Sequence, residues 1–165
     1  MLFSAAILML AAPSFAASHI VGTPGDERLV GTDSRDWIEA RGGDDHVLGR
    51  SGNDYLVGGD GKDVVRGGPG RDELYGGRGG DVVTGGTGQD ALNGDRGQDV
   101  LRGGLDDDFL ADYDDGDLLL GGRGKDRAAI LSEDPGSRAI TRLHLGPGDD
   151  EVMVSDDGQP DVIDC

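Results

Sequence analysis

The 165-residue chain is poor in the residues that hold most small domains together. It has one cysteine, Cys165 at the last position, so no internal disulfide can stabilise the fold. Aromatic residues make up only 4% of the chain, which argues against an ordinary globular core. Lys and Arg number 15 against 33 Asp and Glu, so the formal net charge is −18. A chain this acidic is not expected to bind nucleic acid and attracts cations instead.

Long hydrophobic runs are also missing. The apolar run at residues 2–12 is too short to span a bilayer, and no later stretch is apolar enough to do so. Ser14, Phe15 and Ala16 follow it with the small–x–small pattern of a signal-peptidase site, although no Lys or Arg precedes Arg28. We expect residues 1–16 to be a signal peptide cleaved after Ala16, and the protein to be secreted, with no membrane span. A buried N-terminal strand is the alternative interpretation.

Motifs for catalysis are lacking as well. The three histidines, His19, His46 and His144, are scattered, and no His-Glu-x-x-His pattern occurs. The Gly-Lys pairs at residues 61–62 and 124–125 lack the other residues of a phosphate-binding loop. The sequence therefore predicts a protein that is not an enzyme.

Glycine, in contrast, is abundant, with 32 residues, and most of them belong to a nine-residue repeat. Twelve rows of nine fit without a gap from Gly22 to Ala129. The first position is Gly in ten rows and the fourth in nine. The sixth position is Glu27 in the first row and Asp in the other eleven. The eighth position is aliphatic throughout: Leu29, Ile38, Val47, Leu56, Val65, Leu74, Val83, Leu92, Leu101, Leu110, Leu119 and Ala128.

The rows GGDGKDVVR, GGPGRDELY and GGTGQDALN resemble the haemolysin-type, or RTX, calcium-binding nonapeptide repeat. The resemblance covers residues 22–129 and is strongest over residues 49–102. It implies an all-β fold: a parallel β-roll, of the right-handed parallel β-helix type, with about six coils of 18 residues. It also implies that Ca²⁺ is the ligand, and that backbone carbonyls of the glycine-rich turns complete the ligand shell.

The residue types support the same architecture independently. Positions seven to nine are enriched in β-branched and aromatic residues, which favour strands. Three residues are too few for a strand to stand alone, so we expect stacking in parallel ladders about 4.8 Å apart. The eighth side chain then points inward from both sheets into a narrow aliphatic core. Glycine in the six-residue turns supplies positive φ angles without steric strain.

Stacking alternate rows gathers the sixth-position acids into two columns, one on each edge. Carboxylates about 5 Å apart repel by roughly 1–3 kcal/mol per pair, and a divalent ion between them reverses that repulsion. Ca²⁺ accepts six to eight oxygen ligands in flexible geometry. Up to nine Ca²⁺ ions fit between column neighbours. The predicted metal ligands are Asp36, Asp54, Asp72, Asp90, Asp108 and Asp126 on one edge, and Asp45, Asp63, Asp81, Asp99 and Asp117 on the other.

Two alternative interpretations of the acids stay open: Asp as a mere turn former beside Gly, and a repeat that folds without metal. Asp106 and Asp115 replace the fourth-position Gly, and Asp112 replaces a first-position Gly, so this stretch is expected to be distorted or to bind ions differently. Ser34, Ala40 and Arg41 break the glycine pattern near the N-terminal end.

Position seven is expected to face outward. On one sheet this position is apolar in four neighbouring coils, which indicates either β-propensity alone or a docking strip for a protein or surface partner. The strip consists of Val64, Val82, Val100 and Leu118.

The expected organisation is a signal peptide (1–16), a linker (17–21), the β-roll (22–129) and a C-terminal β cap (130–165). Gly148, Asp150 and Val152 give that cap one degenerate repeat. The expected function is a secreted, non-enzymatic calcium-binding repeat protein that folds as several Ca²⁺ ions bind between stacked turns. The alternatives are an accessory or truncated module of a secreted hydrolase or polysaccharide-active enzyme, and a cell-surface adhesion element. Cys165 is expected either to stay reduced or to form a disulfide-linked dimer.

Overall fold

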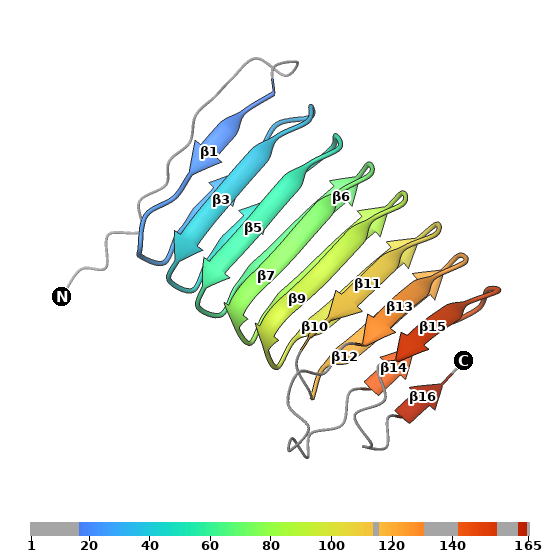
Figure 1. The fold of residues 1–165 in the computed structure, drawn as a ribbon. Coiled ribbons are helices and arrows are strands. Elements are labelled where there is room, and N and C mark those ends of the chain that lie inside the picture. The colour runs from blue at the N-terminus through green and yellow to red at the C-terminus, as the bar shows by residue number, and fades with distance from the viewer. Residues whose placement is uncertain (1–16, 114–115, 131–141, 155–161, 165) are drawn as a thin grey trace.

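The computed structural model describes residues 17–113, 116–130, 142–154 and 162–164. The predicted signal peptide (1–16), Asp115 and Cys165 lie outside these residues. The described chain contains strands and no helix, and the strands form two parallel sheets that face each other along a solenoid (Figure 1). It therefore also contains no helix that could cross a membrane. The predicted all-β parallel β-roll is confirmed.

Consecutive strands alternate between the sheets, so neighbours within a sheet are two strands apart in the chain. The first sheet contains β1 (His19–Val21), β3 (Trp37–Gly42), β5 (Tyr55–Asp60), β7 (Glu73–Gly79), β9 (Ala91–Gly97), β11 (Phe109–Asp112), β13 (Arg127–Ile130) and β15 (Glu151–Val154). The second contains β2 (Arg28–Val30), β4 (His46–Leu48), β6 (Val64–Pro69), β8 (Val82–Thr87), β10 (Val100–Leu105), β12 (Leu118–Arg123), β14 (Arg142–His144) and β16 (Val162–Asp164).

The register reproduces the sequence repeat. Leu56 pairs with Leu74 across β5 and β7, and Val65 pairs with Val83 across β6 and β8, in each case 18 residues apart. One nine-residue row is therefore half a coil. Most strands begin at position seven, where β-branched and aromatic residues favour extended backbone, and many continue into the first glycines of the next row.

The core is the column of eighth-position side chains, as the sequence predicts. All twelve, from Leu29 to Ala128, are between 0 and 2% exposed, and Leu143 and Leu145 extend the same cluster. Burying each Leu, Ile or Val contributes about 1.5–3 kcal/mol. The core is narrow, because each row contributes one buried side chain from position eight.

The turns require left-handed backbone at positions two and four of many rows. Gly59 and Gly61 have φ angles of 116° and 140°. The same region is adopted by the non-glycine residues Arg41, Arg50, Asp95 and Asp106. The turn conformation thus persists where the glycine pattern is broken, because the stacked neighbours fix it.

Strand pairing continues on both sides of residues 22–129. Residues 17–21, expected to be a linker, include β1, in which Ile20 pairs with Ile38. At the other end the expected β cap is built from β14, β15 and β16, which continue the two sheets in parallel. No glycine precedes β1 (His19–Val21) to mark its row in the sequence.

The predicted outward strip is continuous. Its four residues lie side by side, in register, on β6, β8, β10 and β12, and each is half-buried. Position seven therefore points away from the core as expected.

Candidate metal centre

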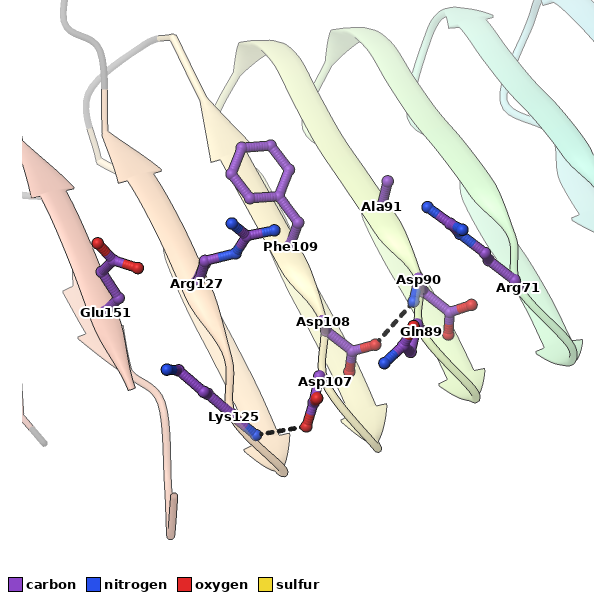
Figure 2. Close-up of a pocket in the computed structure, with 10 residues that line it drawn as sticks. All are labelled: Arg71, Gln89, Asp90, Ala91, Asp107, Asp108, Phe109, Lys125, Arg127 and Glu151. Atoms are coloured by element: carbon purple, nitrogen blue, oxygen red, sulfur yellow. Dashed lines mark hydrogen bonds between the residues drawn. The ribbon is translucent and has the colours of Figure 1, made fainter. Parts of the chain in front are cut away.

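Two columns of aspartates follow the edges of the roll, each Asp lying immediately before a strand. Within a column, the backbone N–H of one Asp donates to Oδ1 of the Asp 18 residues later. The N–H of Asp54 reaches Asp72 at 2.8 Å, and the N–H of Asp63 reaches Asp81 at 2.8 Å. Figure 2 shows one such bond, from Asp90 to Asp108, at 2.9 Å. This ladder holds one oxygen of each carboxylate in a fixed place between two coils.

The second carboxylate oxygen has different surroundings in most members of the columns. Within the described part of the chain, nine of these aspartates have a buried Oδ2 that accepts no hydrogen bond. They are Asp45, Asp54, Asp63, Asp72, Asp81, Asp90, Asp99, Asp108 and Asp126. A buried, ionised oxygen without a partner destabilises a fold by several kcal/mol unless it is protonated or bound by a cation.

The position-one glycines show what these oxygens face. A methyl group built on Gly76 would lie 2.7 Å from Oδ2 of Asp81 and 2.8 Å from the carbonyl oxygen of Gly94 in the next coil. At Gly58 the corresponding distances are 2.5 Å to Oδ2 of Asp63 and 2.6 Å to the carbonyl oxygen of Gly76. A carboxylate and a carbonyl oxygen thus border one small space, which glycine keeps open. Two acceptors around a shared space suit a hard cation with oxygen ligands, such as Ca²⁺.

The electrostatics of the protein alone are unfavourable. Burial and, to a smaller extent, neighbouring carboxylates raise the pKa of Asp54, Asp90, Asp99 and Asp108 to about 7, although the N–H bonds lower it. For the same reasons the pKa of Asp45, Asp63 and Asp81 rises to about 6. Burial also raises the pKa of Asp72 and Asp126 above the ordinary value. Ionised columns near neutral pH therefore need a positive partner.

One of the eleven predicted ligands has other surroundings. Oδ2 of Asp36 accepts hydrogen bonds from the N–H of Thr32 at 2.5 Å and from its hydroxyl at 3.1 Å, and Oδ1 accepts one from the N–H of Ser18 at 2.6 Å. Protein donors therefore surround Asp36, unlike the later members of its column. Asp117 is buried and accepts the N–H of Asp99 at 2.5 Å, as its column requires.

The structure also places two acids in the columns that were not predicted as ligands. Asp150 receives the N–H of Asp126 at 2.9 Å and so continues the first column, although the spacing is 24 residues instead of 18. Asp112 lies with Asp99 and Asp117, each offering an oxygen within 4.8 Å of the others. The repeat pattern at Gly148 and Val152 was a signal for Asp150, whereas Asp112 appeared in the sequence only as a departure from glycine.

Charged side chains line the rim of the first column. A surface pocket of about 320 Å³ beside Asp90 and Asp108 is bordered by Arg71, Lys125 and Arg127 (Figure 2). Its lining combines turn residues such as Lys125 with the strand residues Arg127 and Glu151.

Comparison with known proteins gives a result consistent with this geometry. The family model for the RTX calcium-binding nonapeptide repeat, which itself comprises four copies of the repeat, matches residues 21–56, 48–83, 57–92, 75–110 and 93–128. A search of curated proteins finds no match. The matched segments together cover residues 21–128, well over half of the chain. The chain is a calcium-binding repeat protein and belongs to the RTX calcium-binding nonapeptide repeat family.

Proposed function

We propose that this protein is a secreted, non-enzymatic β-roll that folds when several Ca²⁺ ions bind between neighbouring turns. The observation that carries the proposal is the set of nine buried Oδ2 atoms without a hydrogen-bond donor in the described chain. The family match gives the ion, and the facing carbonyl oxygens give the remaining ligand type. The position-six aspartates would hold the ions, with Asp36 the least suited because donors already surround it.

Coupling between folding and binding follows from the burial of these charges. In the unfolded chain the carboxylates are hydrated and far apart, so the sites exist only when coils are stacked. Each ion joins two coils, and each coil contacts only its neighbours, so binding should be cooperative along the roll. Extracellular calcium modules bind at roughly 10⁻⁴–10⁻³ M, so we expect the chain to be unfolded where calcium is scarce.

A calcium titration tests this function. Far-ultraviolet circular dichroism of the full chain should show coil in excess chelator and a cooperative gain of strand signal at millimolar Ca²⁺. Mg²⁺ should replace Ca²⁺ poorly, because it requires a tighter octahedral shell. A fully folded protein in chelator that takes up no calcium when titrated would refute the proposal.

Export and organisation form the second part of the proposal. The apolar run at residues 2–12 and the small–x–small pattern ending at Ala16 support cleavage after Ala16. The two sheets support a roll spanning residues 22–129, continued by the strands of residues 142–164. N-terminal sequencing of protein recovered from the culture medium should begin at Ala17. Retention of an intact N-terminus inside the cell would contradict this part alone.

A further inference from the structure

Asp112 occupies the position that glycine holds in ten of the twelve rows. It is the last residue of β11 and is fully buried. Asp99, Asp112 and Asp117 each place one oxygen within 4.8 Å of the others, and all three side chains are buried. Asp99 and Asp117 belong to one column and are joined by the bond from the Asp99 N–H to Oδ1 of Asp117. Asp112 adds a third carboxylate to that edge.

The position-one backbone explains why this side chain enters the ligand space. A methyl group built on Gly94, the position-one residue of the preceding coil on this edge, would lie 2.5 Å from Oδ2 of Asp99. Ala111 pairs with Asn93, so the next residues, Asp112 of β11 and Gly94 of β9, lie at the same level in neighbouring coils. A side chain at position one therefore points toward the column and not toward solvent. The carboxylate of Asp112 thus lies near those of Asp99 and Asp117, at an edge where glycine rows have no side chain.

A second observation indicates that a ligand belongs there. Oδ2 of Asp99 is buried and accepts no hydrogen bond from any described residue, and it is part of the cluster. Three carboxylates this close, away from solvent, repel strongly unless a cation lies between them. A separation of up to 4.8 Å between ligand oxygens fits an ion that is 2.3–2.6 Å from each.

We propose that Asp99, Asp112 and Asp117 form a three-carboxylate cation site, which differs from the repeat sites by one additional charged ligand. This inference rests on the proposed function for the identity of the natural ion, Ca²⁺. Affinity for Ca²⁺ rises with the number of charged ligands, so this site fills before the others. Its greater negative charge also favours trivalent lanthanide ions over Ca²⁺ more strongly than the repeat sites do.

The location gives such a site a role in assembly. The rows around it depart most from the glycine pattern, with Asp106 at position four and Asp112 at position one. An ion bound early at Asp99, Asp112 and Asp117 joins the residues before β10 and β12 to the end of β11. The C-terminal coils then have an ordered edge to stack on.

The test uses the full chain and compares three variants by calorimetric titration with Ca²⁺ and, separately, with Tb³⁺. Asp112→Gly restores the repeat residue and removes the third carboxylate, and Asp112→Asn keeps the side-chain shape without the charge. Asp106→Gly is the matched control, because it also restores a repeat glycine and removes one negative charge, at an exposed position. Circular dichroism at saturating calcium confirms that each variant is folded.

We expect one tight class of site in the wild type and in Asp106→Gly. Asp112→Gly should lower the affinity of that class for Ca²⁺ about tenfold or more, with a larger loss for Tb³⁺. Asp112→Asn should also lower both affinities. Equal titrations of wild type and Asp112→Gly would overturn the inference, and so would equal weakening by Asp106→Gly. A wild type that binds no calcium at all would instead refute the proposed function.

Discussion

The substitution Asp81→Asn separates the two effects of a column carboxylate, its destabilisation of the ion-free fold and its affinity for an ion. Asn retains an oxygen that can accept the N–H of Asp63, the bond that Asp81 accepts at 2.8 Å. Its side-chain amide then occupies the place of Oδ2. A methyl group on Gly76 would lie 2.7 Å from that oxygen and 2.8 Å from the carbonyl oxygen of Gly94, so the neutral amide borders the same space as that carbonyl.

The size of the effect follows from the pKa. Burial raises the pKa of Asp81 from 3.8 to about 6. In the ion-free protein the folded state therefore loses stability as the pH rises above 3.8, and the loss is complete above about 6. Two pKa units correspond to about 3 kcal/mol, and water entering an ion-free turn reduces this to roughly 1.5–3 kcal/mol. Asn is neutral and avoids this loss at every pH.

The assay has an ion-free arm and a calcium arm. At pH 7.5 without calcium, trimethylamine N-oxide should induce folding, and its midpoint should be lower for Asp81→Asn than for the wild type. In the calcium titration the same variant should need more calcium, because a charged ligand is lost. Asp33→Asn serves as the control, since Asp33 is exposed and its removal changes the net charge equally.

Opposite shifts in the two arms are the signature of a buried ligand. If Asp81→Asn lowered stability in both arms, the carboxylate would be a structural acceptor only. If Asp33→Asn reproduced both shifts, general charge repulsion would account for the result instead of the column.

Three further predictions concern pH, the ligand space and the core. Without calcium, the strand signal should increase as the pH falls from 8 to 5, because the pKa values of about 6–7 in the folded state exceed the ordinary 3.8. The calcium-loaded protein should instead release ions over the same pH range. The same change of circular dichroism with pH in both forms would contradict this. Gly58→Ala should remove one calcium ion from the calorimetric stoichiometry, because its methyl group fills the space beside Asp63, and Gly42→Ala, whose methyl group has its nearest contact at 3.5 Å, should bind the full number. Leu74→Ala should destabilise the folded state by about 2–5 kcal/mol and raise the calcium midpoint of folding, since Leu74 is fully buried, and an unchanged midpoint would indicate that folding and binding are not coupled.

Most of the fold could be predicted from the repeat, because every row has the same types of residue at the same positions. Position eight in every row predicts the core, and position six predicts the columns, as Leu74 and Asp81 illustrate. The strand at His19–Val21 could not be predicted this way. It belongs to the ladder through backbone pairing with β3, and its row has none of the glycines that mark the others.

The local surroundings of individual carboxylates were less predictable. The convergence of Asp112 with Asp99 and Asp117 depends on how β11 ends beside a neighbouring coil, which spacing alone does not state. Asp150 joins its column across a 24-residue spacing, which the 18-residue period of the repeat does not predict. The repeat shows which types of residue recur, whereas the contacts of Asp112 and Asp150 depend on the geometry of rows that depart from it.

The residue at position two decides whether a column acid meets a protein donor or an open space. Thr32 directs its N–H and hydroxyl to Oδ2 of Asp36, and Thr23 directs its N–H to Glu27 at 2.7 Å. Neither threonine has the positive φ that Gly59 and Gly68 adopt at the same position in later rows. With positive φ at position two, the column acids of those rows, Asp63 and Asp72, receive no such donor on Oδ2 among the described residues. The first two rows therefore satisfy their acids from within the protein, and dependence on ions begins with the coils that follow them.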